Sequence, residues 1–165
     1  DDSGNNLIYK LCVFLLLDTG LRTNELLNIL VKNIDLEENS IFIETTKNGK
    51  NRYVYFSDLS KPTILKVLKL SNSPYLFINL LNGGLFSARA LRYFLDKMKN
   101  DLRFDKLHAH QFRKTFAMGL LKNGAGLEII QKLLGHSDIK MTMVYLDVYD
   151  YYVAKEYKKF QPTYI

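Results

Sequence analysis

The chain has 165 residues, the size of one domain that can bury enough apolar surface to fold without a disulfide staple. Hydrophobic residues make up 47% and charged residues 24%, an ordinary globular balance, and a single cysteine, Cys12, excludes a disulfide within the chain. The apolar run over 11–17 is too short to span a bilayer, and with the lone thiol it leads us to expect a cytoplasmic protein. A net charge of +6 fits an acidic partner such as nucleic acid as well as it fits a basic protein with no such partner.

The first part of the chain is predicted to combine helices with one hairpin. Residues 6–17 are apolar on nearly every side, which predicts a largely buried helix, and Thr19-Gly20 breaks it before a second helix over 23–30. Strands are predicted over 41–45 and 52–56, and the Asn-Gly pair between them is a strong hairpin signal.

The rest of the chain is predicted to be helical. A helix is expected over 61–70, Ser87 is suited to cap a helix that runs to about residue 100, and Gly135 is suited to end a helix over 127–134. Further helices are expected over 111–122, 140–146 and 149–160. The fold class is therefore mainly α with a small antiparallel β-sheet, an α+β domain.

An arginine stands at the start of the second predicted helix, directly after the glycine turn. Helix N-termini favour acidic side chains, so Arg22 is unfavourable for the helix dipole at this position. An arginine beside helix-terminal N–H groups is useful where an anion binds. The alternative is a surface ion pair between Arg22 and Glu25.

A histidine and an arginine share a predicted helix in the last third of the chain. His110 and Arg113 are three residues apart, a spacing that puts both side chains on one face. Phe112, Phe116 and Leu120 recur at helical spacing on another face and are expected in the core. The helix would then present His110 and Arg113 together, either as part of a site or as a solvated polar face.

The segment Leu133-Leu134-Gly135-His136 is followed by a tyrosine nine residues later, Tyr145. His136 comes directly after a helix-ending glycine, where the turn can hold it. Tyr145 lies in a mostly apolar stretch, and the chain has 11 tyrosines, so a structural role in the core is the alternative.

Together these clusters resemble the tyrosine recombinase, or phage integrase, family. The family's first box reads like Thr-Gly-Leu-Arg-x-x-Glu-Leu, matched at 19–26, and its second carries His-x-x-Arg, then Leu-Leu-Gly-His, then a tyrosine nine residues on. The family's active-site lysine lies in the β-hairpin between the boxes, where Lys47 stands and Lys50 is the alternative. The resemblance runs from about residue 7 to residue 148 and implies the catalytic-domain fold of that family.

The resemblance implies that DNA strands are cut and rejoined through a 3′-phosphotyrosyl link. Tyr145 would attack the phosphate, while Arg22 and Arg113 would bind its non-bridging oxygens and stabilise charge on the pentacoordinate phosphorus. His110 would contact the scissile phosphate and accept the tyrosine proton. Lys47 would protonate the leaving 5′ oxygen as a general acid.

Further positions follow from the same resemblance. His136 would donate another hydrogen bond to the phosphate, and Glu25 would brace the first box. The residue after the second arginine is often histidine in this family and is Lys114 here, which we expect to change a contact with the DNA backbone rather than the chemistry. His108 and His110 could suggest zinc, but no cysteine or carboxylate completes a tetrahedral set. We expect no metal, cofactor or ATP, because two arginines and a lysine supply the positive charge that metal ions supply elsewhere.

The expected partners are double-stranded DNA and further copies of the chain, assembled as a tetramer on paired DNA sites, with no membrane and no small-molecule substrate. The family carries a DNA-clamping domain ahead of the catalytic one, and residues 1–165 contain only the latter, so we expect a single catalytic domain from a longer protein. Two other functions are open: a type IB topoisomerase-like strand transferase, which needs no second DNA site, and a catalytically silent DNA-binding module.

The stretch 149–160 carries an apolar stripe at helical spacing, formed by Tyr149, Tyr152, Val153, Tyr157 and Phe160. Members of the family commonly pass such a segment to a neighbouring protomer, which the resemblance implies here. The alternative is that the stripe packs on its own domain.

Overall fold

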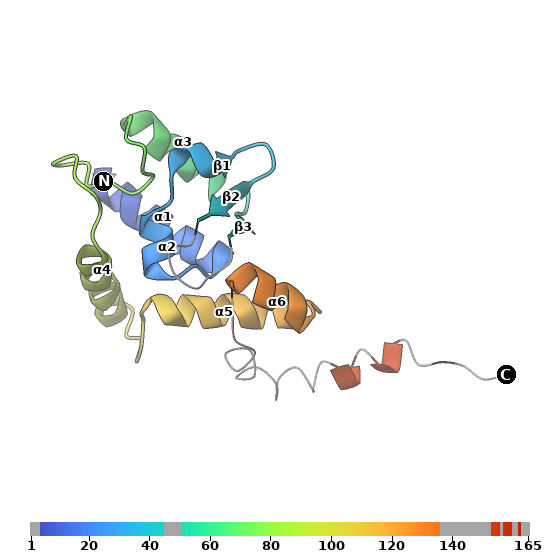
Figure 1. Cartoon of the computed structure of the whole chain (residues 1–165). Coiled ribbons are helices and arrows are strands. Elements are labelled where there is room, and N and C mark those ends of the chain that lie inside the picture. Colours follow the sequence, from blue (N-terminus) through green and yellow to red (C-terminus); the bar gives the residue numbers. More distant parts are fainter. Residues whose placement is uncertain (1–3, 45–50, 136–152, 156, 160–161, 163–165) are drawn as a thin grey trace.

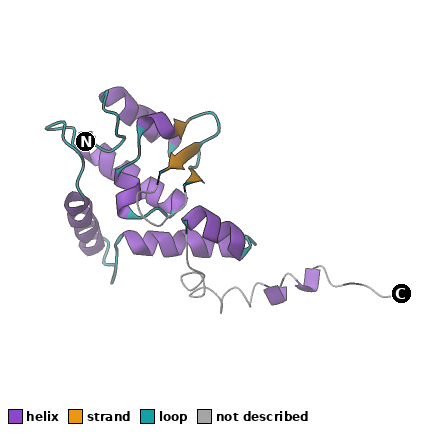
Figure 2. Ribbon diagram, viewed as in Figure 1, coloured by secondary structure: helices purple, strands orange, loops and turns teal. Residues whose placement is uncertain are grey.

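The computed structural model describes residues 4–44, 51–135, 153–155, 157–159 and 162 (Figure 1). Its helices are α1 (Gly4–Thr19), α2 (Thr23–Leu27), α3 (Lys61–Leu70), α4 (Ala88–Asp101), α5 (Ala109–Lys122) and α6 (Leu127–Leu134), with a 3₁₀ turn, η1, over Val31–Asn33. Its strands are β1 (Ile34–Asp35), β2 (Ser40–Ile43) and β3 (Arg52–Tyr55). Helices dominate and the small sheet lies at one side (Figure 2), so the predicted fold class is confirmed.

Helix α1 lies at the centre of the hydrophobic core and packs against α3, α4, α5 and β3. Its apolar side chains occupy nearly every side of the helix, and Ile8, Leu11, Leu15 and Leu16 are completely buried. Full burial of one such side chain stabilises a fold by about 1.5–3 kcal/mol. The predicted buried helix is confirmed and extends slightly beyond the 6–17 range at both ends.

The three strands form one antiparallel sheet in the order β1-β2-β3. Ile41 pairs with Val54 and Ile43 pairs with Arg52, which confirms the predicted strand pair. The outer face of the pair carries the aromatic residues Phe42, Tyr53 and Tyr55. Strand β1 was not predicted, because two residues are too few to establish a period-2 alternation.

Helices α5 and α6 pack on each other around a second, smaller hydrophobic cluster. Its completely or almost completely buried members are Ala117, Leu121, Ile130 and Leu134. Helix α6 ends at Gly135, whose φ of 64° is left-handed, so the predicted glycine cap is confirmed. Figure 1 shows the two helices side by side below the end of α1. Helix α5 makes the contact with α1.

Other predicted helix ends are confirmed or shifted by local hydrogen bonds. The ranges of α3 and α6 agree with the prediction, and the Ser87 hydroxyl accepts the Ala90 N–H at 3.1 Å as the predicted cap of α4. Helix α2 is shorter than the predicted 23–30, because the chain turns into η1, where the Val31 N–H donates to the Pro74 carbonyl. Phe112 is buried as predicted, whereas Phe116 and Leu120 are only half-buried against the second cluster.

Several predictions fall outside the described residues: the hairpin turn over 45–50, the helix over 140–146 and part of the helix over 149–160. The described tail residues, 153–155 and 157–159, are helical and exposed. Within the described parts of the chain, no helix has the length and apolarity needed to cross a membrane.

Candidate active site

The first box meets the second at Gly20, whose φ of 61° lies in the left-handed region. A Cβ atom on this glycine would lie 2.6 Å from Cδ1 of Phe116 and 2.9 Å from Cδ2 of Leu134. Those distances are shorter than van der Waals contact, so only glycine allows α1 to end this close to α5 and α6. The Thr-Gly of the first box therefore brings the residues before Arg22 against the second box.

Arg22 is the N-cap of α2, and 45% of its side chain is exposed. Its backbone N–H donates to Oε2 of Glu25 at 2.9 Å, and its Nη1 lies 3.5 Å from Oε1 of the same carboxylate. The ion pair considered from the sequence is thus present, but a long, exposed pair contributes only about 0–1 kcal/mol. The guanidinium stays accessible to an anion from solvent.

Arg113 lies in the opposite environment, with only 4% of the residue exposed. Its Nη1 donates to the Gly20 carbonyl at 2.7 Å and its Nη2 to the Leu134 carbonyl at 2.8 Å. One side chain therefore joins the two boxes, although 93 residues separate Arg113 from Gly20. The predicted face shared with His110 away from the core is wrong, and so is the alternative of a solvated polar face, because Arg113 shares the buried stripe of α5 with Ala117 and Leu121.

His110 is exposed in the first turn of α5, where it lines a hollow of about 310 Å³ between α2, α4 and α5. Thr23, which directly follows Arg22, also lines the hollow. Partial burial lowers the pKa of His110, and the positive charges of Lys114, His108 and Arg113 lower it further. A lowered pKa favours the neutral imidazole, the form that accepts a proton.

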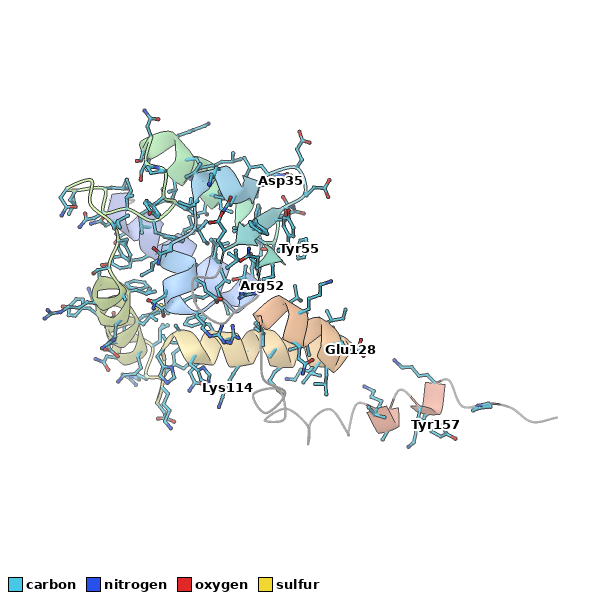
Figure 3. The ribbon with its side chains drawn as sticks, in the orientation of Figure 1. Asp35, Arg52, Tyr55, Lys114, Glu128 and Tyr157 are labelled. Carbon is cyan, nitrogen blue, oxygen red and sulfur yellow. The ribbon has the colours of Figure 1, made fainter. Side chains whose placement is uncertain are left out.

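Glu25 has a closer partner that the sequence did not identify, Arg52, the first residue of β3. Arg52 is labelled in Figure 3, close to α6. Its Nη1 and Nη2 atoms donate to Oε1 and Oε2 of Glu25 at 2.8 and 3.1 Å, a bidentate pair between α2 and the sheet. Burial by itself raises the pKa of Glu25, but the hydrogen bonds from Arg52 and Arg22 and their charges outweigh it and lower that pKa. Glu25 therefore braces the first box, as the resemblance implies.

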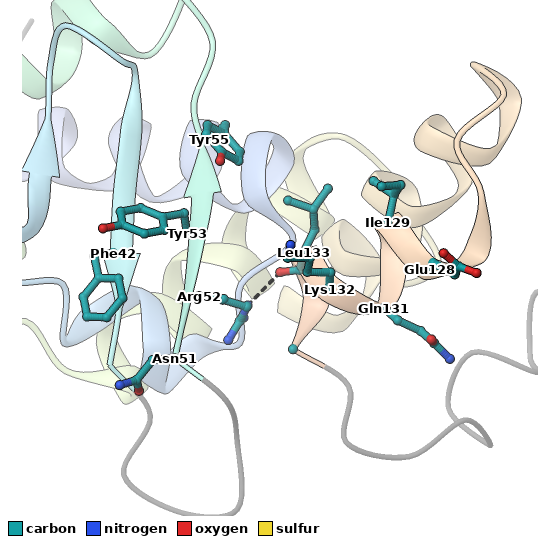
Figure 4. A pocket seen from close by; sticks show the side chains of 11 residues that line it. Phe42, Asn51, Arg52, Tyr53, Tyr55, Glu128, Ile129, Gln131, Lys132 and Leu133 are labelled. Carbon is teal, nitrogen blue, oxygen red and sulfur yellow. Dashed lines mark hydrogen bonds between the residues drawn. The ribbon is translucent and has the colours of Figure 1, made fainter.

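Two arginines also bind the C-terminal end of α6. The Nε of Arg52 donates to the Leu133 carbonyl at 2.7 Å (Figure 4). The next carbonyl, that of Leu134, accepts from Arg113. The last carbonyls of a helix have no intrahelical N–H partner, and cations also suit the negative end of the helix dipole. A Cβ on Gly135 would lie 2.6 Å from Nη1 of Arg52, so the glycine is needed for space as well as for conformation.

Three of the six predicted catalytic residues lie in the described part of the chain, and their surroundings meet. Arg113 donates to the carbonyl of Gly20, two positions before Arg22. His110 lines the same hollow as Thr23, the residue after Arg22. Lys47, His136 and Tyr145 lie outside the described residues. The surroundings of Arg113 and His110 thus include Gly20 and Thr23, which flank Arg22 in the first box.

A groove of about 720 Å³ separates the outer face of the sheet from α6 (Figure 4). Tyr53 and Tyr55 line one side and Ile129 the other, and each is more than half exposed. Apolar side chains facing one another across an open groove are typical of an interaction surface. The sequence analysis did not predict this groove.

Residues 2–151 match the model of the phage integrase family. A probable integrase/recombinase of Acholeplasma phage L2 is 34% identical over 161 residues, 97% of this chain and 56% of the phage protein. Tyrosine recombinase XerA of Saccharolobus solfataricus is 45% identical over 136 residues, 82% of this chain and 44% of XerA. The crystal structure of the XerH site-specific recombinase bound to its difH substrate, a pre-cleavage complex, gives a TM-score of 0.73 at 26% identity, covering 84% of this chain and 42% of XerH.

The observed fold is that of the catalytic domain of tyrosine recombinases. This chain belongs to the phage integrase family, and it spans about half the length of the curated relatives it matches.

Proposed function

We propose that this chain is the catalytic part of a site-specific recombinase that cuts and rejoins double-stranded DNA for integration or excision. The observation that carries the proposal is the Arg113 guanidinium bound to the Gly20 carbonyl, two residues before Arg22. This buried arginine joins the two boxes that carry the predicted catalytic residues. The relatives described as recombinases support the same reading.

In the proposed reaction, the Tyr145 oxygen attacks the scissile phosphorus while Arg22 and Arg113 stabilise the charge that develops on the non-bridging oxygens. Neutral His110 accepts the tyrosine proton, and Lys47 gives a proton to the departing 5′ oxygen. His136 donates a further hydrogen bond to the phosphate. The 3′-phosphotyrosyl bond conserves the energy of the phosphodiester, so religation by the 5′ hydroxyl needs no ATP, and the cationic side chains take the place of metal ions. We expect the reaction in the cytoplasm.

The test is covalent capture on a nicked duplex, which loses the short 5′ fragment after cleavage and so traps the protein–DNA adduct. The unsubstituted protein should give an adduct on a denaturing gel, and Tyr145→Phe, which removes the attacking oxygen alone, should give none. Tyr93→Phe, at a tyrosine 72% exposed on α4, is the matched control and should react normally. An adduct formed by Tyr145→Phe would contradict the assignment, and no adduct from the unsubstituted protein would favour a silent DNA-binding module.

A second assay separates a recombinase from a type IB topoisomerase-like enzyme. A recombinase should exchange strands between two duplexes that carry its site, because it brings the two sites together before it rejoins the strands. A topoisomerase-like enzyme should relax supercoiled DNA as a monomer and yield no exchanged product.

We further propose that the protein self-associates on DNA as a tetramer, with the C-terminal tail of one copy docked on its neighbour. Val153 and Tyr157, the described members of the apolar tail stripe, are 47% and 60% exposed, which supports docking away from their own domain. The groove between the sheet and α6 offers exposed Tyr53 and Ile129 as an acceptor. Such a head-to-tail exchange would couple each active site to the next copy.

Removal of residues 149–165 should weaken cooperative assembly on two-site DNA, measured by band shift, while binding to a single site stays largely intact. Ile129→Ser in the groove should have the same effect, and Leu81→Ser, at a side chain 84% exposed on a distant loop, should not. Loss of folding on deletion, seen by circular dichroism, would instead mean that the tail belongs to its own core.

A further inference from the structure

Arg52 is a buried charge for which the proposed chemistry gives no role. Only 6% of the residue is exposed, and all three of its nitrogens donate to partners on other elements. A buried guanidinium is costly to desolvate and persists where its hydrogen bonds are complete. The contacts made by Arg52 therefore indicate what it holds in position.

The first contact reaches Arg22 through Glu25. Arg52 binds both carboxylate oxygens of Glu25, and the same carboxylate accepts the Arg22 N–H and lies 3.5 Å from its Nη1. A carboxylate gripped at both oxygens cannot rotate away from the start of α2. Arg52 thus determines the orientation of the group that holds Arg22.

The second contact reaches Arg113 through the end of α6. Arg52 donates to the Leu133 carbonyl, and Arg113 donates to the adjacent Leu134 carbonyl. The two guanidinium groups are therefore hydrogen-bonded to consecutive peptide units. Displacement of one carbonyl would displace the other. Arg52 therefore connects the environments of both arginines that are proposed to bind the phosphate.

The charge of Arg52 is already matched by Glu25, which makes Arg52 unsuited to bind the phosphate itself. We propose that Arg52 is a positioning residue, which sets the geometry of Arg22 and Arg113 through Glu25 and the end of α6. This inference rests on the proposed function and assigns to the reaction a third arginine that does not touch DNA. A misplacement of about 1 Å in such groups costs on the order of 100-fold in rate.

The test variant is the double substitution Arg52→Gln/Glu25→Gln, which removes both charges and leaves neither carboxylate nor guanidinium buried alone. Arg52→Lys keeps the charge but loses the planar, multiply bonded geometry. Lys69→Gln, at an exposed position of α3, is the control for the loss of one positive charge. Thermal melting and circular dichroism establish that each variant is folded before rates are compared.

Cleavage is measured on two substrates, an ordinary nicked duplex and one with a methylphosphonate at the scissile position. The double variant should cleave the ordinary phosphate roughly 100-fold more slowly, and Arg52→Lys should fall between it and the unsubstituted protein. On the methylphosphonate, which has no non-bridging negative charge for the arginines to stabilise, the difference should shrink below about tenfold. Lys69→Gln should cleave both at the unsubstituted rate.

A third substrate tests whether Arg52 acts through the hairpin lysine instead. A 5′-bridging sulfur leaves without a proton, so it would rescue a defect in general-acid catalysis, and we expect no rescue here. Rescue by sulfur, an equal deficit on phosphate and methylphosphonate, or an unchanged rate in the folded double variant would each overturn the inference. Failure of the unsubstituted protein to form any adduct would instead refute the proposed function.

Discussion

Arg22 and Arg113 share one proposed task and lie in contrasting surroundings. Arg22 caps a short helix, is nearly half exposed, and has a long ion pair with Glu25 as its side-chain contact. Arg113 is buried and bound to two backbone carbonyls from other parts of the chain. The two roles are therefore separated within one site. Arg113 also holds the fold together, and Arg22 is available to respond to the ligand.

The largest expected effect is that of Arg113→Ala. Cleavage should be lost, and the free energy of unfolding should fall by about 3–5 kcal/mol, because the Gly20 and Leu134 carbonyls lose their donor in a buried place. Urea unfolding followed by circular dichroism measures the stability change. Arg113→Lys should recover part of the stability and little of the activity.

Arg22→Ala tests the exposed arginine of the pair. Cleavage should fall about 100- to 1000-fold with almost no change in melting temperature, because the residue is exposed and its ion pair contributes little. Equal destabilisation by the Arg22 and Arg113 substitutions would remove the distinction between them.

A smaller effect is expected for Gly135→Ala. The left-handed φ costs about 1–2 kcal/mol for a residue with a Cβ, and that Cβ would lie 2.6 Å from the Arg52 guanidinium. Stability should fall by about 2–3 kcal/mol and the cleavage rate should fall with it, since the end of α6 must shift. Gly124→Ala, at a left-handed glycine with open space around it, is the matched control and should cost only the backbone term.

The smallest expected effect concerns pH. His110 is the proposed proton acceptor in its neutral form, and its pKa is lowered from the ordinary 6.5, so the cleavage rate should stay level near neutral pH and fall only at more acidic values. His108→Ala removes one of the charges that lower this pKa, so the acidic fall should move to higher pH. A fall that moves the other way, or does not move, would indicate that another group is being titrated.

Much of the fold follows from local signals in the sequence. The helices over 61–70 and 127–134 were predicted at both ends, and Gly135 was the signal that ends the second. The two-residue strand β1 lacks such a signal, because it is defined by its pairing with β2. Local patterns therefore predict elements well and miss those that tertiary pairing creates.

The site was predicted less completely, because burial depends on distant partners. Arg113 was expected with His110 on the face of the helix away from the core, although its spacing from Ala117 and Leu121 places it on the buried stripe. Arg52 was not considered, although it precedes the buried Val54 by two residues and so shares its face of β3. In both cases an arginine in register with apolar residues was the available signal of a buried charge.

The division of the interior into two clusters has a consequence for hydrogen exchange. Helix α1 is enclosed by the main core, whereas the second cluster has few fully buried side chains. Helix α6 is therefore held partly by the hydrogen bonds from Arg52 and Arg113 to its last carbonyls. Elements with little buried apolar surface open at lower free energy than the whole protein unfolds. The amides of α6 should therefore exchange with deuterium sooner than those of α1, as a sub-global opening unit. The stretch that carries the proposed nucleophile follows this unit directly in sequence, so a ligand that orders the site should slow exchange in α6 first.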